Sequence, residues 1–245
     1  MYKSKIFYIK VSGNYAMWTS AHSKTSGDRT TYQVPTKEAL RGIADACYFK
    51  PTFINRIDEV KVINQIKTET MGARTLLNKG GNDLNNYSYL RDVCYLVKFH
   101  FEWNLDREDL ANDRNIKKHE AIMERSLKRG GRRDVFLGTR ECYGFVEKID
   151  KVEYEQAKSF YEGQNLSFGI MFSEFIYPTK PGKELISCFT DTTMNDGLIK
   201  FKDSKDCEIK NTLDTYSFKY PDEIKSVDVE YEEYENFEDG GLWMN

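Results

Sequence analysis

Cysteine, histidine and long apolar runs are scarce in this chain of 245 residues, and each scarcity excludes a class of protein. The five cysteines are scattered without a Cys-x-x-Cys spacing, which indicates neither a disulfide framework nor a zinc site. With three histidines and no His-Glu-x-x-His motif, a metal site would have to rest on carboxylates alone. We therefore expect a protein without a metal ion or another cofactor.

Membrane proteins are disfavoured by a similar absence. No run approaches the roughly 18 apolar residues that span a bilayer, and three lysines interrupt the first ten residues, where a signal peptide would become apolar. Hydrophobic residues make up 40% of the chain and charged residues 31%, as is typical of a soluble globular protein. We expect a cytoplasmic protein with no membrane partner.

The formal net charge of −3 conceals an uneven distribution. From Asp222 to the end, nine acids accompany a single base, which leaves the residues before Asp222 with a net charge of +5. The body is thus mildly basic and the tail strongly acidic. A basic body is compatible with a nucleic-acid partner, while the tail can repel stray nucleic acid or contact a basic protein.

The densest positive charge lies in residues 114–133, where the net charge is +6. A cap at Asn112 or Asp113 can begin a helix here, and Gly130-Gly131 can end it in the left-handed conformation. A solvated helix face is one interpretation of this charge. The crowding of cations into the last turn and the glycine loop, whose backbone N–H groups could face an anion, favours contact with a phosphate backbone.

His119 lies in this helix directly after Lys117 and Lys118. An imidazole exchanges a proton near neutrality, and an adjacent ammonium stabilises charge that develops on a phosphate. A histidine on a helix is also often structural or simply exposed. We interpret the Lys-His pair beside a cationic loop as the simplest arrangement for cutting RNA without a metal ion.

The expected elements up to residue 149 follow the order strand, helix, strand, strand, helix, strand. We expect strands at residues 5–11, 53–65, 92–103 and 141–149, and helices at residues 35–47 and 112–129. The polar residues 68–87 form either a hairpin or a flexible loop. This order is the βαββαβ arrangement of the ferredoxin-like fold, an antiparallel sheet with two helices on one face, whose open face binds RNA in RRM domains.

Strand-forming residues return after residue 150. We expect a short helix at residues 154–162 and strands at residues 166–177, 185–189 and 198–201. The sequence therefore predicts an α+β protein in two parts. Residues 1–150 form a ferredoxin-like (RRM-like) RNA-binding and catalytic domain, and residues 151–245 form a small antiparallel β-sheet domain with an acidic C-terminal tail.

Two further segments have structural interpretations. Tyr143-Gly144-Phe145-Val146 resembles part of the RNP1 motif of RRM domains, but RNP1 lies before the second helix and this segment follows it. We therefore interpret it as an inward-facing aromatic strand. His100 falls on a half-exposed face of the strand at residues 92–103, and we expect no catalytic role for it.

Several stretches together carry a resemblance to a known family. They are the strand that opens at Lys5, Pro-Thr-Lys-Glu-Ala-Leu-Arg-Gly-Ile at residues 35–43, the Lys118-His119 pair, Arg-Gly-Gly-Arg-Arg at residues 129–133, and Phe-Leu-Gly-Thr-Arg-Glu-Cys at residues 136–142. The chain resembles the Cas-five family of CRISPR-associated proteins in the RAMP superfamily, specifically the subtype I-C form that processes CRISPR precursor RNA. The resemblance covers nearly the whole chain and implies a ferredoxin-like domain with a small β-sheet extension.

The resemblance also implies a metal-independent endoribonuclease that cuts at the base of the repeat hairpin, with Tyr48, Lys118 and His119 as catalytic residues. In such a reaction the 2′-hydroxyl beside the scissile bond attacks its phosphate, which leaves a 2′,3′-cyclic phosphate and a 5′-hydroxyl. His119 and Tyr48 both remain candidates for the base, and Lys117 is an alternative to Lys118. The expected RNA-binding residues are Lys117, Arg125, Lys128, Arg129, Gly130, Gly131, Arg132, Arg133 and Arg140.

The implied partners are CRISPR repeat RNA and the other subunits of a Cascade-like surveillance complex, in which the nuclease stays bound to its product. Double-stranded DNA is open as a further partner. Many members of the superfamily only hold the 5′ handle of the guide RNA, so a non-catalytic handle-binding subunit is the alternative. A third possibility is a general RNA- or DNA-binding subunit with an incidental histidine.

Overall fold

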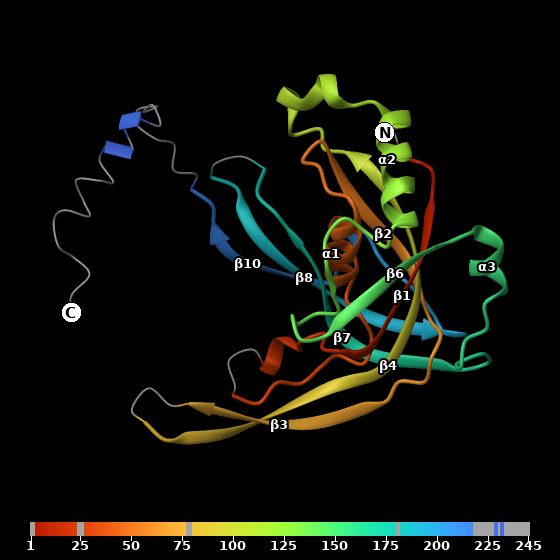
Figure 1. Cartoon of the computed structure of the whole chain (residues 1–245), viewed down its shortest axis with the longest axis vertical. Helices are drawn as coiled ribbons and strands as arrows, with labels where there is room; N and C mark the ends of the chain where they lie inside the picture. Colours follow the sequence, from red (N-terminus) through yellow and green to blue (C-terminus); the bar gives the residue numbers. More distant parts are fainter. Residues whose placement is uncertain are drawn as a thin grey trace.

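The computed structural model describes residues 3–23, 27–76, 80–179, 182–217, 228–229 and 231–232. Over these residues the chain is a mixed α/β structure, in which few helices accompany a mostly antiparallel β-sheet (Figure 1). Most of the acidic tail from Asp222 lies outside the described residues, and the expectation for its role lies outside them too.

Ten strands form the sheet. In chain order they are β1 (Phe7–Ala16), β2 (Phe53–Val62), β3 (Thr68–Leu76), β4 (Asn82–Trp103), β5 (Val135–Phe136), β6 (Tyr143–Ile149), β7 (Asn165–Ile176), β8 (Glu184–Asn195), β9 (Leu198–Lys200) and β10 (Ile209–Thr215). Neighbouring strands follow the order β10-β8-β9-β2-β4-β1-β6-β5, while β3 pairs with β4 and β7 pairs with β8. The strands β2, β4, β1 and β6 are therefore neighbours in the middle of the sheet.

The hydrophobic core lies between this sheet and the helices α1 (Lys37–Cys47) and α2 (Ile116–Lys128). Strand β1 alternates buried Phe7, Ile9 and Val11 with less buried residues, and it pairs with β4 on one side and β6 on the other. These buried side chains belong to one cluster with residues of β4, α1 and α2. Burial of this apolar face holds two helices on the sheet that would be marginal in isolation.

The expected element order is found in β1, α1, β2, β4, α2 and β6. Thr36 caps α1, as its side-chain oxygen accepts a hydrogen bond from Ala39 N–H. Residues 68–87, for which a hairpin or a loop was open, form a hairpin of β3 with the first half of β4, which extends away from the helices in Figure 1. Strand β4 is longer than expected, because its first residues bury too little apolar surface to show a one-sided pattern.

Two expectations about this part of the chain are wrong in detail. Helix α3 (Lys151–Gln156) begins before residue 154, because the Asp150 carboxylate accepts a hydrogen bond from Glu153 N–H and caps it there. His100 is buried instead of half-exposed, since Asp58 and Glu102 lie 3.0 and 3.4 Å from its ring nitrogens.

The C-terminal strands continue the same sheet. Val60 of β2 pairs with Ile199 of β9, and β9 pairs in turn with β8. Strands β9, β8 and β10 therefore extend the sheet beyond β2. The division into domains at residue 150 stays a prediction.

Candidate active site and cationic loop

Tyr48 follows the last residue of helix α1 and is buried in the core. Its backbone is extended, with φ −158° and ψ 116°, while its N–H still donates to the carbonyl of Ala44. Pro51 follows three residues later and cannot continue a helix. This turn leaves Tyr48 only 1% exposed and packs its ring against Phe53, at a centroid distance of 5.3 Å.

Helix α2 begins later than expected and places His119 in its first turn. The side chain of Asn115 caps the helix by accepting a hydrogen bond from Lys118 N–H at 3.1 Å. The expected cap at Asn112 or Asp113 is wrong, because those residues belong to the preceding 3₁₀ helix η2 (Glu108–Asp113). The buried residues His119, Met123, Ser126 and Leu127 follow the helical period, so His119 lies on the side of α2 that faces the core.

The imidazole of His119 is enclosed by aromatic rings. Phe53, Trp103 and Phe101 meet it edge-on at centroid distances of 5.4, 5.7 and 6.5 Å, and Tyr48 lies more nearly parallel to it at 6.0 Å. His119 is 0% exposed as a result. A proton can therefore enter or leave this ring only through the groups that hydrogen-bond to it.

Both ring nitrogens of His119 have such partners. The Tyr48 hydroxyl lies 2.8 Å from Nδ1, and the backbone carbonyl oxygen of Asp113 lies 2.8 Å from Nε2. Because a carbonyl oxygen only accepts, Nε2 must carry a proton. In the neutral ring Nδ1 is then the acceptor, and the Tyr48 hydroxyl donates to it. His119 Nδ1 is therefore placed to accept the phenolic proton of Tyr48.

Asp113 connects the buried histidine with the exposed lysine beside it. Its carboxylate accepts hydrogen bonds from Lys118 Nζ and, at 2.8 Å, from Thr52 Oγ1, and one carboxylate oxygen lies 3.4 Å from His119 Nε2. The hydrogen bonds from Lys118 and Thr52 lower the pKa of Asp113 to about 2. The carboxylate is therefore ionised at neutral pH and holds Lys118 at the edge of the site.

Tyr48 is a protonated donor at neutral pH. Burial raises the pKa of its phenol, although the Arg132 guanidinium, which lies 4.8 Å from the ring centroid, acts to lower it. The residues brought together at this place are thus a buried phenol, a buried imidazole, and two cations at the surface. Such a set can move a proton and stabilise negative charge.

The loop after α2 turns back onto the end of α1. Gly130 and Gly131 adopt φ of 81° and 110°, as the expected helix end requires. Their N–H groups donate to the carbonyls of Leu127 and Ser126, so these groups end the helix and are not open to an anion, contrary to expectation. The N–H groups of the two following arginines donate to the carbonyl of Ala46. The loop is thus held against the ends of α1 and α2 by its backbone, and only its side chains are available to bind a partner.

All the cations expected to bind RNA are exposed in this structure. They are Lys117, Arg125, Lys128, Arg129, Arg132, Arg133 and Arg140. Within the described part of the chain, none of them lies within ion-pair distance of a carboxylate, whereas Lys118 does. Their charge is therefore available to an anion from outside the chain.

A groove of about 510 Å³ runs between this loop and strand β6. Arg129, Arg132 and Arg133 line it from the loop, and Tyr143 and Phe145 line it from the strand. The interpretation of this strand as inward-facing is wrong for both aromatic residues, which are 50% and 59% exposed. The strand buries the residues between and after them. In the sequence, the alternation of the strand places the two rings on one face, but it does not show which face is buried.

Arg140 lies outside this groove, in the turn at residues 137–142. The turn is fixed to the end of β1, where Met17 N–H donates to the carbonyl of Leu137 at 2.9 Å. Gly138 allows this close approach, because a Cβ there would lie 1.9 Å from the Met17 carbonyl oxygen. The glycine of the Phe-Leu-Gly-Thr-Arg-Glu-Cys segment at residues 136–142 thus has a structural role, and in this segment only Arg140 stays a candidate for RNA contact.

Among the described residues, no group of three or more His, Cys, Asp or Glu side chains is placed to hold a metal ion. No helix in that part of the chain is long and apolar enough to cross a membrane. A reaction without a metal ion stays a prediction.

The model of the family described as CRISPR-associated protein (Cas_Cas5) matches residues 7–204. A protein of Thermus thermophilus named CRISPR pre-crRNA endoribonuclease Cas5d is 27% identical over 186 residues, which cover 71% of this chain and 75% of that protein. A protein of the same name from Mannheimia succiniciproducens is 26% identical over 166 residues, which cover 58% of this chain and 72% of that protein.

Two crystal structures are similar over most of the chain. One, of a CRISPR-associated protein, is 52% identical with a TM-score of 0.76, and the match covers 86% of this chain and 99% of that one. The other, of a functionally uncharacterized protein from Streptococcus mutans, is also 52% identical, with a TM-score of 0.75 and coverage of 86% and 100%. The mixed α/β fold with its mostly antiparallel sheet is therefore shared with these proteins.

Proposed function

Because the chain belongs to the Cas5 family of CRISPR-associated proteins, we propose that it is a metal-independent endoribonuclease that cleaves CRISPR precursor RNA at the repeat hairpin. Two similar proteins are named CRISPR pre-crRNA endoribonucleases, which supports the substrate. The observation that carries the proposal is the 2.8 Å hydrogen bond between the Tyr48 hydroxyl and His119 Nδ1, beside exposed Lys118. A titratable pair next to available cations suits proton transfer at a phosphate.

In the proposed reaction Tyr48 exchanges a proton with the RNA, and His119 exchanges one with Tyr48. As the 2′-hydroxyl attacks the phosphate, its proton passes to the Tyr48 oxygen while the phenolic proton moves to His119 Nδ1. The Asp113 carbonyl retains the proton on Nε2, and the Asp113 carboxylate at 3.4 Å offsets the positive charge of the ring.

Lys118 acts on the other side of the reaction. Its ammonium offsets the negative charge that builds on the phosphorus centre. The bond to the 5′ oxygen then breaks, and that oxygen takes a proton from the Lys118 ammonium or from water. The products carry a 2′,3′-cyclic phosphate and a 5′-hydroxyl.

The RNA reaches this pair only after a local movement, because Tyr48 is 1% and His119 0% exposed. Arg132 is exposed and lies over the Tyr48 ring at 4.8 Å. A phosphate that binds Arg132 draws its guanidinium away from the ring and opens a path to the hydroxyl. The enclosure of His119 is the reason for assigning the contact with RNA to Tyr48.

The finer fold assignment belongs to the same proposal. Strand order β2-β4-β1-β6, with α1 and α2 as the two helical connections, supports a ferredoxin-like domain for RNA binding and catalysis in residues 1–150. Residues 151–245 then form a small β-sheet domain. After cleavage the protein stays bound to the mature crRNA as a subunit of a type I-C surveillance complex.

Cleavage of a CRISPR repeat hairpin RNA in EDTA tests this function. We expect the wild-type protein to cut at one site and to leave a cyclic phosphate, while His119→Ala and Tyr48→Phe bind the RNA with unchanged affinity and cut at least about 100-fold more slowly. A substrate with a 2′-deoxyribose at the cut site should bind and stay intact. Cleavage of that substrate, or equal rates for wild type and both variants, would falsify the mechanism.

The second candidate function is a subunit that only holds the 5′ handle of the guide RNA. It is favoured by the contrast between the exposed cations and the nearly complete burial of Tyr48 and His119. In this case wild type and variants all bind the repeat RNA and none cuts it. A general nucleic-acid-binding subunit is distinguished by equal affinity for the repeat hairpin and for arbitrary RNA of the same length.

A further inference from the structure

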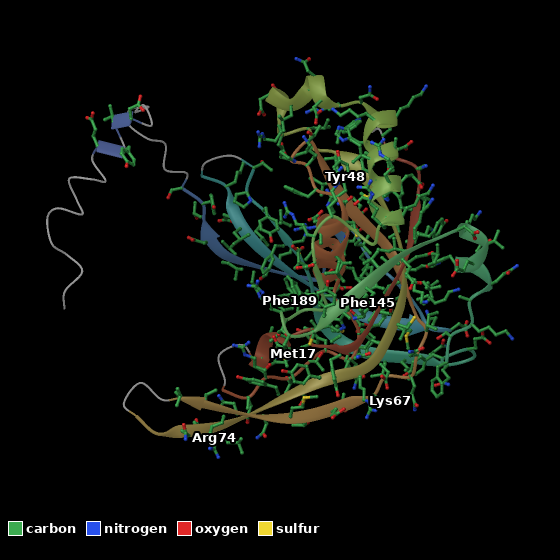
Figure 2. All side chains as sticks on the ribbon, viewed as in Figure 1. Met17, Tyr48, Lys67, Arg74, Phe145 and Phe189 are labelled. Atoms are coloured by element: carbon green, nitrogen blue, oxygen red, sulfur yellow. The ribbon has the colours of Figure 1, made fainter. Side chains whose placement is uncertain are left out.

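A second cavity, of about 580 Å³, lies beside helix α1 and shares no lining residue with the groove at the cationic loop. We call it the α1 pocket. Its walls come from α1, from the residues that follow β4 and from the end of β7, which contribute Arg41 and Asp45, Asn104 and Asp106, and Phe175 and Tyr177 respectively. Tyr48, which Figure 2 labels beside α2, contacts His119 and does not line this pocket. The α1 pocket is therefore a site apart from the candidate active site.

Two side-chain amides that line the pocket have a buried oxygen without a donor among the described residues. Asn55, which is 1% exposed, donates through Nδ2 to the Asp45 carboxylate at 2.7 Å and to the Tyr48 carbonyl at 3.2 Å. Asn104 donates through Nδ2 to the carbonyl of Pro51 at 3.1 Å. Since carbonyl and carboxylate oxygens accept here, these bonds fix the orientation of both amides and leave each Oδ1 as an acceptor. A buried acceptor without a donor is costly, and a ligand with N–H groups would remove that cost.

The charges at the pocket are paired except for two acids. Each of its three arginines lies within ion-pair distance of a carboxylate outside the pocket, and Glu174 is paired with Lys37 at 2.8 Å. In the part of the chain that the structure describes, no cation lies within that distance of Asp45 or Asp106. Burial raises the pKa of the Asp45 carboxyl, because its charged form is poorly stabilised in the free protein. The pocket is thus complementary to a cation and repels a phosphate.

Exposed aromatic side chains also line the pocket. Phe49 and Tyr177 are 51% and 52% exposed, and the ring centroid of Phe175 lies 5.9 Å from that of Tyr177. Arg41 lies over the Tyr177 ring at 5.2 Å, so this part of the pocket already holds one guanidinium against a ring. An arginine side chain combines an apolar stem, which packs on such rings, with a permanent charge and five N–H donors. Arginine and aromatic residues are also the usual anchors of protein interfaces.

We propose that the α1 pocket binds an arginine side chain of a neighbouring protein subunit. The stem packs against Phe49, and the guanidinium contacts Asp45, Asp106 and the free amide oxygens of Asn55 and Asn104. The inference rests on the proposed function, in which the protein stays in a surveillance complex, and adds an interface site to it. A nucleic acid fits this pocket poorly, because its phosphates would meet the two unpaired acids. RNA and the protein partner can therefore bind at separate sites at the same time.

Titration with two small molecules tests the chemistry of the pocket directly. N-acetyl-arginine amide is added to the full-length protein, and the NMR signals of the side-chain amides of Asn55 and Asn104 are followed. We expect both signals to shift and to reach saturation. N-acetyl-citrulline amide has nearly the same shape without the charge, and it should bind at least about tenfold more weakly. Asp45→Asn should lose most of this preference for arginine.

Association with the other purified subunits of the complex tests the partner. The protein is first loaded with mature crRNA, so that the assay does not depend on cleavage. We expect Phe49→Ala to weaken association about tenfold and Asp106→Asn about threefold, since the first is an aromatic contact and the second an exposed charge. Both variants should bind and cut the repeat hairpin RNA in EDTA as the wild type does, because neither residue lies in the candidate active site or the cationic loop.

Two matched variants separate the pocket from general changes of the surface. Phe160→Ala removes a ring of similar exposure, 52%, that lines a different cavity. Glu162→Gln removes an exposed acid that lines a cavity beside α3 and has no cation within ion-pair distance among the described residues. Both should associate with the subunits and bind the arginine probe as the wild type does.

Four results would overturn the inference. If citrulline binds as tightly as arginine, or if neither probe shifts the two amide signals, the pocket is not a site for a cationic side chain. Wild-type association of Phe49→Ala and Asp106→Asn refutes the interface, and cleavage of the hairpin by the wild-type protein then leaves the proposed function intact. If these variants lose affinity for RNA instead, the pocket is an RNA contact. A wild-type protein that neither cuts the hairpin nor associates with the subunits refutes the inference and the function together.

Discussion

Replacement of Asp113 by asparagine removes one charge from the site and nearly preserves its shape. The Asp113 carboxylate lies 3.4 Å from His119 Nε2 and is 26% exposed. A unit charge at this distance stabilises a ring cation by about 1 kcal/mol in bulk water and about 5 kcal/mol at an effective dielectric constant of about 20. For a partly exposed group a value of about 2 kcal/mol is reasonable, which slows cleavage roughly 30-fold. The same substitution releases Lys118 from its anchor.

Single-turnover cleavage with protein in excess measures this effect without interference from binding. We expect Asp113→Asn to cut about 30-fold more slowly while its affinity for RNA stays equal or rises, because an anion has left a cationic surface. Asp109→Asn is the matched control: Asp109 belongs to the same 3₁₀ helix but bonds to Arg107. If both variants cut at the wild-type rate, the proposed support of His119 by Asp113 is refuted.

Removal of the hydrogen bond from Thr52 should weaken the support of His119 by Asp113 to a smaller extent. Thr52 Oγ1 donates to Asp113 Oδ2 at 2.8 Å. Thr52→Val removes this bond at nearly constant volume and should slow cleavage several-fold, about as much as the loss of one hydrogen bond to a charged group allows. Thr52→Ser retains the hydroxyl and should restore the rate. Equal rates for valine and serine would mean that the orientation of Asp113 does not matter.

Three further expectations concern stability and binding. Because the pKa of Asp113 is lowered, its ionised carboxylate stabilises the fold at pH values above its ordinary pKa of 3.8, and this stabilisation is lost as the pH falls towards about 2. In urea unfolding, Asp113→Asn should be less stable than wild type by about 1 kcal/mol at pH 7, after allowance for solvent screening, and equal to it near pH 2. Gly138→Ala should lower the free energy of unfolding by roughly 3 kcal/mol or more, because its Cβ would meet a carbonyl oxygen at 1.9 Å, whereas Gly163→Ala, with positive φ but open space, should lose only about 1 kcal/mol. Arg133→Ala should reduce the slope of log affinity against log salt by about one, measured by filter binding from 50 to 300 mM salt, and Arg41→Ala, whose guanidinium is paired with Glu38, should not.

Local signals were enough to predict the elements that lie over a core. Helix α1 was predicted at residues 35–47 and lies at Lys37–Cys47, and the strict alternation from Val93 to Trp103 predicted the inner half of β4. The outer half of β4 and its partner β3 were left undecided, because both faces of that hairpin contact solvent and no alternation is required. Periodicity detects burial on one side, and a hairpin without a buried side is invisible to it.

The candidate site could be predicted only as a set of residue types. The Lys-His pair and the basic loop are adjacent in sequence, so composition and spacing found them. The contact of Tyr48 with His119 joins residues 71 positions apart. The hydrogen bond from His119 Nε2 to the Asp113 carbonyl requires residues 108–113 to form a 3₁₀ helix, whereas the sequence predicted that Asn112 or Asp113 caps α2. The exposure of Tyr143 and Phe145 depends on the packing of Gly144 against Leu137, which no local pattern contains.

The position of the cationic loop reduces the electrostatic repulsion among its arginines. Helices α1 and α2 both end beneath this loop, and the carbonyl of Ala46 accepts the N–H groups of Arg132 and Arg133. The C-terminal end of a helix carries the negative pole of its macrodipole, equivalent to about half an elementary charge. Two such poles offset the repulsion among the arginines without engaging their side chains. An incoming phosphate therefore has no internal ion pair to displace, and the helices keep the loop cationic and ready to bind.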